Sequence, residues 1–570
     1  MQSAKVVASL PSGSAWVRLI APWIFVLVSS LALADAHSES TQSMKSAEHM
    51  MAMAPPNAVP AATTLLTGYG TGGFAVKTSS QEAQAYFNNG MQLAHAFAHK
   101  PAIAAFRRAE QLDPQCAMCA WGEAWARGPT INYTISETVQ VQLVSLADHA
   151  AALAKDNPSN EQALIAALQK RYHQGGGKGP GDRAFAQAMD ALYESNPSDD
   201  EIAVITADAW MIPAAQENNR DHLDRSIQIL ENVLRRSPDN SAAIHFYIHA
   251  TEMDGVAGEA LPYAEKLARL APAASHLVHM PSHTYFSVGQ YRAAESANLD
   301  AVKIDDANAT RLKPKGGVFG LPYHGHNVQY GEAATLIDGD AKEGLALATA
   351  QLQQVSATDA SSFLHQFEFV TAYFVFGRFA SPQTVASLPA PDKTLPYALA
   401  MWHYARGEAD ARSGDAQGVQ REAEQIAVDP KELANFGNSA AQVASMVDIA
   451  RLVLQGRVAM MEKRWNDAEA DYRKAADMQD AKLEAFTDPP TWWYPVRRSV
   501  AVALLAKGDP IAAEVEINAA LAHWPLDPQS LNILADCQQA MGHLEEAKHQ
   551  NVLAKNNWLG DAAALPMAQL

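Results

Sequence analysis

Histidine is concentrated in one part of the chain, because seven of its 19 histidines fall in the stretch from His245 to His326. Two short segments, HFYIHATE and HLVHMPSH, hold five of these histidines and one acid. Imidazole nitrogens and carboxylate oxygens bind divalent transition metals such as zinc and copper. The candidate metal ligands are His245, His249, Glu252, His276, His279, His283 and His326.

The two segments are related by a constant offset. His279 follows His245 at the same interval at which His283 follows His249. This interval matches the period of about 34 residues that is typical of arrays of helix pairs. Residues spaced i, i+4 and i+7 lie on one face of a helix, so His245, His249 and Glu252 would project together. This face is the predicted metal-binding face.

A repeating pattern of small and bulky residues extends over most of the chain. It begins with Gly90, continues with Ala102, Phe106 and Ala109, and ends with Pro114. The pattern resembles the tetratricopeptide repeat (TPR), in which small residues let two antiparallel helices approach and a bulky residue fills the gap between them. The frame returns near residues 260–272, 289–301, 465–475, 508–525 and 542–554.

Helical periodicity begins near Ser80, and no run of alternating β-branched residues follows it. We therefore expect an all-α fold, a TPR-like α-solenoid formed by a superhelical array of antiparallel helix pairs. The resemblance implies that fixed positions of each first helix line a concave groove. It places at such positions His245, His249, Glu252, His276, His279, His283 and His326.

Neighbouring helices pack about 8–10 Å apart, so imidazoles from adjacent repeats could meet and share one ion or one ligand. The alternative is a hydrogen-bonded network, in which the histidines stiffen the array together with Tyr247, Tyr285 and Asn327. Buried imidazoles without partners would be costly, and either arrangement would supply the partners. Both hypotheses remain open at the level of sequence.

No known catalytic motif accompanies the histidines. His245 is followed by Phe246 and Tyr247, so the HExxH motif of zinc proteases is absent. Glu252 could serve as a general base only in a different geometry. A metal-dependent enzyme therefore stays among the hypotheses without an assigned reaction.

Cys116 and Cys119 form a CxxC pair near the start of a predicted helix. Ala120 follows the pair, which excludes the CxxCH motif of haem attachment. The spacing fits a local disulfide or, alternatively, metal ligation by both thiolates. We expect neither haem nor a bound nucleotide as cofactor.

Other residues could contact a ligand in the groove. Arg498 ends the aromatic segment DPPTWWYPVRR, whose side chains could clamp an acidic ligand or could simply fill a seam between helices. A loop at 310–323 leads to His324, and loop insertions in solenoids often mark the binding face. The further candidates are Cys116, Cys119, Tyr285, His324, Asn327 and Arg498.

Composition excludes one class of partner. The chain of 570 residues has a net charge of −19 at pH 7, so it lacks the basic surface that nucleic acid requires. A content of 48% hydrophobic and 18% charged residues is typical of a folded protein.

The N-terminus has the features of an export signal, with an apolar run over residues 19–34 that ends in Ala-Leu-Ala. The Met- and His-containing segment after it would suit copper ions or act only as a tether. No later stretch is apolar enough to span a membrane. We expect an exported protein, periplasmic or secreted. The predicted parts are a signal peptide at 1–36, a flexible linker at 37–79, a TPR-like array with the histidine-rich groove at 80–380, and a second array at 391–570.

The motifs DPxCAMCxWG, HMPSH and PxWxYPVR together are similar to those of exported bacterial TPR proteins. This resemblance implies the fold and the export, and it carries no activity. The first hypothesis is an exported solenoid whose groove binds a divalent transition metal, copper or zinc, or a metal-dependent ligand. The second is a scaffold for a peptide or protein without metal. The third is a metal-dependent enzyme of unknown reaction, and the groove ligand in any of these cases is a peptide, a protein or a small molecule.

Overall fold

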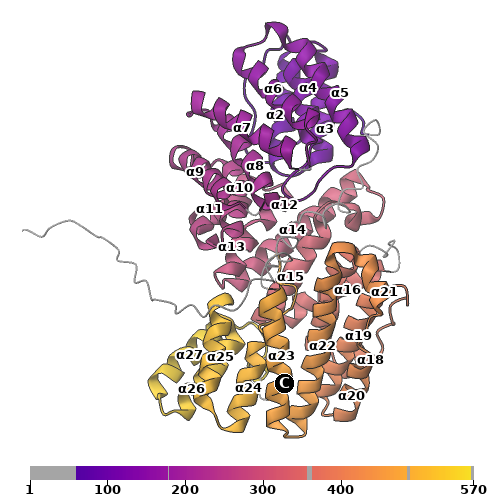
Figure 1. Ribbon diagram of the computed structural model, residues 1–570, viewed down its shortest axis with the longest axis vertical. Coiled ribbons are helices and arrows are strands. Elements are labelled where there is room, and N and C mark those ends of the chain that lie inside the picture. The colour runs from indigo at the N-terminus through magenta and orange to yellow at the C-terminus, as the bar shows by residue number, and fades with distance from the viewer. Residues whose placement is uncertain (1–58, 178, 218, 356–362, 484–487, 566–570) are drawn as a thin grey trace, which may run out of the picture. The chain divides into compact units, whose positions relative to one another are not determined.

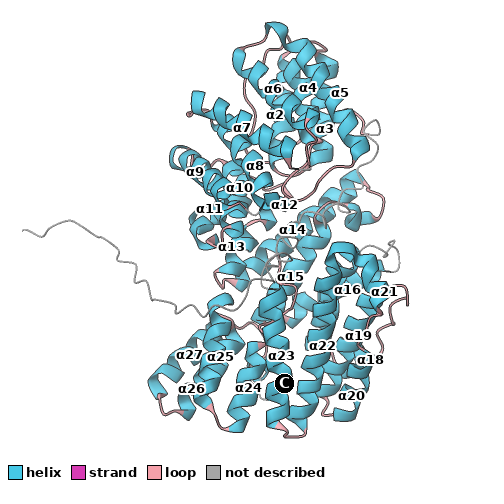
Figure 2. Ribbon diagram, in the orientation of Figure 1, coloured by secondary structure: helices cyan, strands magenta, loops and turns pink. Residues whose placement is uncertain are grey.

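The computed structural model describes residues 59–565 except for 178, 218, 356–362 and 484–487. Helices make up the regular structure, and no strand occurs within these ranges (Figure 1, Figure 2). The prediction of an all-α fold is confirmed.

The helices follow one another with short connections. The first group is α2 (Gln81–His95), α3 (His99–Leu112), α4 (Ala117–Ala126), α5 (Glu137–Leu153), α6 (Ser159–His173), α7 (Pro180–Ser195), α8 (Asp200–Glu217), α9 (Arg220–Arg236), α10 (Ser241–Met253), α11 (Leu261–Leu270), α12 (Ser275–His279), α13 (Pro281–Ser287) and α14 (Tyr291–Leu312). The second group is α15 (His324–Asp338), α16 (Ala341–Val355), α17 (Phe363–Phe379), α18 (Pro382–Ala386), α19 (Pro396–Arg412), α20 (Ala416–Gln425), α21 (Pro430–Leu433), α22 (Ala440–Met461), α23 (Trp465–Leu483), α24 (Arg497–Lys507), α25 (Pro510–His523), α26 (Pro528–Ala540) and α27 (Leu544–Asn556). Short 3-10 helices are η4 (Ala154–Asp156), η5 (Ala257–Ala260), η6 (Gly317–Gly320), η7 (Ala434–Ser439) and η8 (Ala562–Ala564).

Consecutive helices pack against each other along the chain, as α2 does with α3, α8 with α9 and α22 with α23. The small and bulky residues of the repeat pattern explain how closely α2, α3 and α4 approach one another. A Cβ atom built on Gly90 would lie 2.6 Å from Cε1 of Phe106, and the same ring closes against Gly122. Small residues thus make room for one bulky ring between two helix pairs. The chain is a TPR-like α-solenoid.

Gly90→Ala tests this packing rule. The added methyl group would collide with the buried Phe106 ring, and we expect a loss of about 1–2 kcal/mol in the free energy of unfolding after the gain in helix propensity. Urea unfolding followed by circular dichroism measures the loss. Gly258→Ala is the control, because its Cβ would meet Val288 at an ordinary 3.4 Å. Equal stability of both variants would contradict the rule.

The segment 59–79 packs on the helical array, which corrects the linker prediction for this stretch. Tyr69 is buried, and the side-chain amide of Asn89 donates to the carbonyl oxygen of Leu66 at 2.6 Å. The backbone N–H of Thr71 donates to Oγ of Ser241 at 2.7 Å. Hydrogen bonds between the backbone of this segment and side chains of α2 and α10 hold it in place. Such bonds do not require a periodic pattern of hydrophobic residues, so the sequence of the segment shows no sign of them. The predicted signal peptide and the linker residues 37–58 lie outside the described residues.

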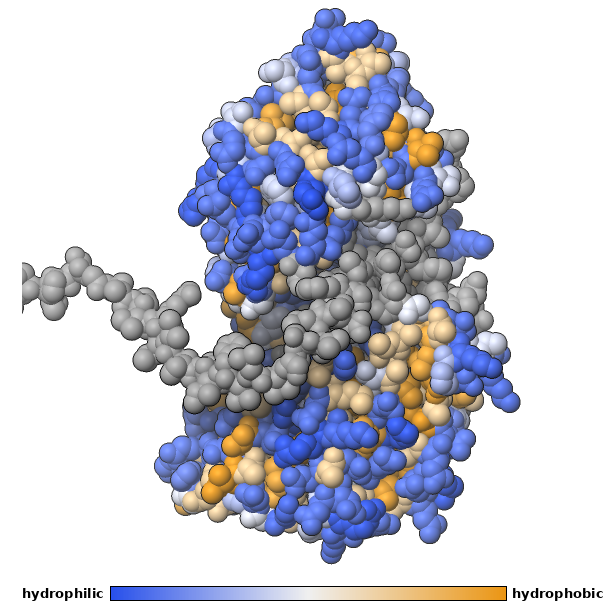
Figure 3. Space-filling model, viewed as in Figure 1, coloured by the Kyte–Doolittle hydropathy of each residue, from blue (hydrophilic) through white to orange (hydrophobic). Residues whose placement is uncertain are grey.

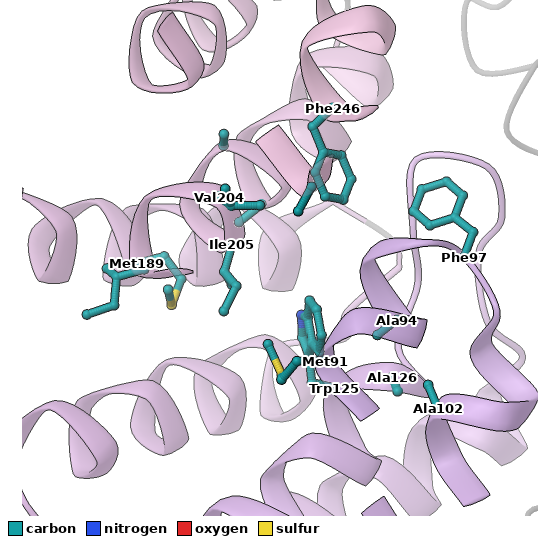
Figure 4. Close-up of a cluster of buried hydrophobic side chains, with 14 of the residues drawn as sticks. Met91, Ala94, Phe97, Ala102, Trp125, Ala126, Met189, Val204, Ile205 and Phe246 are labelled. Carbon is teal, nitrogen blue, oxygen red and sulfur yellow. The ribbon is translucent and has the colours of Figure 1, made fainter. Parts of the chain in front are cut away.

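Two large clusters of apolar side chains fill the core of the array, and the predicted division at residues 381–390 stays a prediction. The first cluster of buried apolar side chains extends from Tyr69 to Met280 and includes Tyr323, and Figure 4 shows part of it around Met91 and Phe246. The next large cluster begins at Leu336 and continues to α26. Pro382 and Pro396 occupy the first positions of α18 and α19, where proline fits a helix.

The face seen in Figure 3 is largely hydrophilic, with smaller apolar patches between the polar residues. Large exposed apolar side chains on the last helices are Ile511, Val515, Leu544 and Val552. Within the described part of the chain, no helix combines the length and the hydropathy needed to cross a bilayer.

Glu332 in α15 is a fully buried acid, and neither of its carboxylate oxygens meets a hydrogen-bond partner among the described residues. Burial raises the pKa of Glu332 well above its ordinary value. The folded protein therefore holds a proton that the unfolded chain releases, and stability falls as the pH rises from the unfolded toward the folded pKa. We expect Glu332→Gln to stabilise the protein by about 1–3 kcal/mol at pH 8 and to change little at pH 4, as measured by urea unfolding. The same gain at both pH values would contradict this account.

Candidate metal centre

Helix α10 presents His245, His249 and Glu252 from successive turns of one face. The helix begins at a side-chain cap, where Oδ1 of Asn240 accepts the backbone N–H of Ala243 at 3.0 Å. Both imidazoles are buried in the interior of the array, and Glu252 follows them near the end of the helix. The helical period therefore places the three side chains as the sequence predicted.

The second pair of imidazoles comes from two short helices that continue one into the other. Met280 joins α12 to α13 with helical dihedral angles, φ −48° and ψ −38°. His279 and His283 thus remain one turn apart on a shared face. His326 comes from the first turn of α15, which follows α14 in the array (Figure 1).

The six predicted histidine ligands divide into two neighbouring groups. Within each group, the candidate ligand atoms lie within 4.8 Å of one another. Each group combines an i, i+4 pair from one repeat with a single histidine from the start of the next helix pair. The first triad is His245, His249 and His276, and the second triad is His279, His283 and His326.

The two triads are in contact with each other. The ring centroids of His249 and His283 are 5.7 Å apart, and those of His276 and His279 are 5.8 Å apart. These separations resemble those inside the triads, so the six rings form one cluster. The rings are buried between helices instead of lining an open groove, and only the His326 side chain, 15% exposed, reaches the surface.

The first triad hydrogen-bonds to a backbone carbonyl and packs against aromatic rings. Nδ1 of His245 donates to the carbonyl oxygen of His95 at 2.7 Å, which leaves Nε2 as a bare acceptor facing Nε2 of His276 at 3.1 Å. Phe97, in the turn after α2, stacks on His276 with centroids 5.1 Å apart, and Tyr323 covers the same imidazole at 4.4 Å. The first triad therefore lies in an apolar enclosure.

Two polar groups orient the second triad. Nδ1 of His279 donates to Oδ1 of Asn298 at 2.6 Å, and the Asn298 amide nitrogen donates to the carbonyl of Ala294, which fixes the direction of the amide. Nδ1 of His283 donates to Oε2 of Glu252 at 2.8 Å. Nε2 of His279 and Nε2 of His283 then face each other at 2.9 Å. Glu252 thus serves the second triad although it lies on the helix of the first.

A further carboxylate reaches the second triad from a distant part of the chain. Oδ1 of Asp488 lies 3.2 Å from Nε2 of His326 and 3.5 Å from Nδ1 of His283. The Asp488 side chain is 52% exposed, so this side of the cluster borders solvent. The hydroxyl of Tyr330 lies 3.3 Å from Nδ1 of His283.

The charge states of the rings differ. Burial lowers the pKa of His245 to about 3, and it also holds the pKa of His279 well below the ordinary value. Neutral imidazole is the form that binds metal. Burial also acts on His283, but the charges of Glu252 and Asp488 outweigh it and raise the pKa of His283 to about 9. Metal bound to Nε2 of His283 would therefore displace a proton.

The sequence analysis missed Phe97, Asn298 and Asp488. Phe97 and Asn298 carry no ligand chemistry of their own, and nothing in the sequence joins them to the histidines. Asp488 had a weak signal, because it opens the aromatic segment already singled out.

The other predicted contact residues lie outside both triads. Cys116 and Cys119 form a disulfide with a Cα–Cα distance of 5.3 Å, and both are buried. His324 and Asn327 both contact Asp305, at 3.1 and 2.9 Å. Arg498 is fully buried and pairs with Asp527 at 3.1 Å, and Tyr285 packs half-buried beside a small apolar cluster.

Comparison with known proteins adds little about function. No protein-family model matches the chain, and no curated protein matches it. Among solved structures, the human IFIT1 dimer with m7Gppp-AAAA is 13% identical, and the likeness covers 81% of this chain and 93% of that chain at a TM-score of 0.32. The APC/C hetero-tetramer Cut9–Hcn1 is also 13% identical, with 83% and 75% covered at a TM-score of 0.28. The function has to be argued from the site itself.

Proposed function

We propose that this protein binds transition-metal ions, copper or zinc, between the helices of its array. The observation that carries the proposal is the contact between Nε2 of His279 and Nε2 of His283 at 2.9 Å. Both rings donate their Nδ1 hydrogens elsewhere, to Asn298 and Glu252. Two unprotonated nitrogens would repel each other at this distance, so the contact needs either the proton of His283 or a cation bound by both nitrogens in its place.

A proton on Nε2 of His283 is the competing explanation, and it corresponds to the hydrogen-bonded network. The first triad favours a metal. There Nε2 of His249 and Nδ1 of His276 are buried without hydrogen-bond partners among the described residues. A network would have to satisfy these nitrogens, whereas a metal site can use them as ligands. Buried nitrogens that converge from several helices are what a preformed metal site requires.

Three histidines on one ion leave a coordination position for water or a small ligand. The protein would therefore hold metal ions and present them to a second molecule, and chemistry at the open position is a further use that the same site would allow. The signal-like N-terminal sequence supports action outside the cytoplasm. A scaffold for a peptide or protein without metal is the alternative function.

Metal analysis of the purified protein tests the proposal. After exhaustive dialysis, the protein should retain or take up at least one equivalent of copper or zinc per chain. The variant His279→Ala/His283→Ala should lose the ion of the second triad. The matched control is His149→Ala/His173→Ala, which removes two half-exposed histidines that pair with Glu110 and Asp148. Less than a tenth of an equivalent, with no uptake on titration, would leave the scaffold as the better account.

A further inference from the structure

The two triads differ in the charges that surround them. In the second triad, the carboxylates of Glu252 and Asp488 lie 2.8–3.5 Å from ring nitrogens of His283 and His326. In the first triad, no carboxylate oxygen of a described residue comes within the 4.0 Å of an ion pair. Its nearest acceptor is the neutral carbonyl of His95. Both triads consist of three imidazoles, but acids lie beside the second triad and aromatic rings lie beside the first.

The surroundings also differ in access to solvent. Glu252 lines an open pocket of about 430 Å³ together with Glu259 and Ser287, and Asp488 is half exposed on its own side of the triad. The first triad has no residue among those that line this pocket. Its rings are at most 7% exposed, and Phe97, buried at 3%, stacks against them. An ion in the first triad would keep its full charge in an apolar environment, and the cost of this rises with the square of the charge.

Contact between the triads adds a second electrostatic condition. With ring centroids only 5.7–5.8 Å apart across the boundary, ions in both triads would repel each other through a medium of low polarity. Replacing one of two divalent ions by a monovalent ion halves the product of their charges and hence this repulsion. Copper is the transition metal that imidazole binds and that is stable as a monovalent ion.

We propose that the first triad is a site for monovalent copper, Cu(I), and that the second triad takes a divalent ion such as Zn(II). This assignment rests on the proposed metal-binding function and extends it to two unequal sites. His245, His249 and His276 supply three neutral donors to the ion of lower charge. Glu252 and Asp488 offset the charge of the divalent ion beside them.

Sequential titration of the metal-free, full-length protein tests the assignment. We expect one equivalent of Zn(II) to bind tightly, followed under anaerobic conditions by one equivalent of Cu(I) that does not displace the zinc. Competition with a zinc chelator and with bicinchoninate gives the two affinities. His276→Gln should weaken Cu(I) binding by about 100-fold and leave Zn(II) binding within about threefold, and His326→Gln should do the reverse. Glutamine preserves side-chain volume, and circular dichroism checks that each variant is folded.

Several results would overturn the assignment while leaving metal binding intact. A second equivalent of Zn(II) as tight as the first would show that the sites are alike, and Cu(I) that displaces the zinc would show a single shared site. If both variants weakened binding of the same ion, the two triads would form a single shared site. A protein that binds neither ion would instead refute the proposed function itself, so the two failures are distinguishable.

Discussion

Removing the bound ions from the full-length protein with a chelator is expected to lower the free energy of unfolding by about 4 kcal/mol, the value for a ligand at a thousand times its dissociation constant. In the proposed sites, the ions would tie α10, α12, α13 and α15 together through buried imidazoles. Without them, the lone pairs of His279 and His283 face each other at 2.9 Å unless a proton intervenes. Differential scanning calorimetry before and after chelation measures the effect as a fall in melting temperature.

The variant His279→Ala/His283→Ala is the control for this prediction. It should melt near the temperature of the metal-free protein and should respond less to the chelator, because the ion of the second triad is already lost. Adding Zn(II) back should restore the wild-type protein and not the variant. A chelator effect of full size in the variant would place the stabilising ion elsewhere in the chain.

Arg457→Met is expected to destabilise the protein by about 3–5 kcal/mol, since it leaves a buried carboxylate without its cation. The guanidinium of Arg457 is 1% exposed and lies 3.3 Å from Oε1 of Glu408. It also donates to the hydroxyl groups of Tyr472 and Tyr494, at 3.2 and 3.4 Å. The pair joins α19, α22, α23 and the aromatic segment before α24, so several helices lose a contact at once. Urea unfolding measures the change.

The double variant Glu408→Gln/Arg457→Met separates the charge from the packing. Removing both charges should recover a large part of the loss, because neutral groups of similar size bury more cheaply than a single ion. Arg464→Ala serves as the exposed reference: its partner Glu462 is about as exposed as it is, and the cost should stay under about 1 kcal/mol. A double variant as unstable as Arg457→Met would show that shape and hydrogen bonding, and not charge, dominate at this position.

The repeat frame predicted the helix pairs because a crossing of two helices requires a small residue opposite a bulky one. Gly90 and Gly122 around Phe106 obey this rule in three dimensions. The same periodicity predicted that His245 and His249 share a face, and it related them to His279 and His283 one repeat later. Helix pairing and the face on which a residue lies depend on residues close in sequence, so both can be predicted from the sequence.

The division into two triads could not be predicted, because it depends on side chains that arrive from distant elements. Phe97 reaches the first triad from the turn after α2, and Asp488 reaches the second from the segment before α24. Neither position has a periodic relation to the histidines. The segment 59–79 was misjudged for a related reason: backbone hydrogen bonds hold it, and these leave no trace in the pattern of side chains.

Each triad is built by one rule, a pair spaced i, i+4 in one repeat and a single histidine at the start of the next helix pair. Because His279 and His283 follow His245 and His249 at one and the same interval, tandem duplication of one repeat that carries both features would produce a new site without any further substitution. Sites of this kind belong to the junctions between repeats and multiply with them. Under the proposed metal binding, the number of ions that the protein can hold would rise with the number of repeats, because each added repeat contributes one more junction.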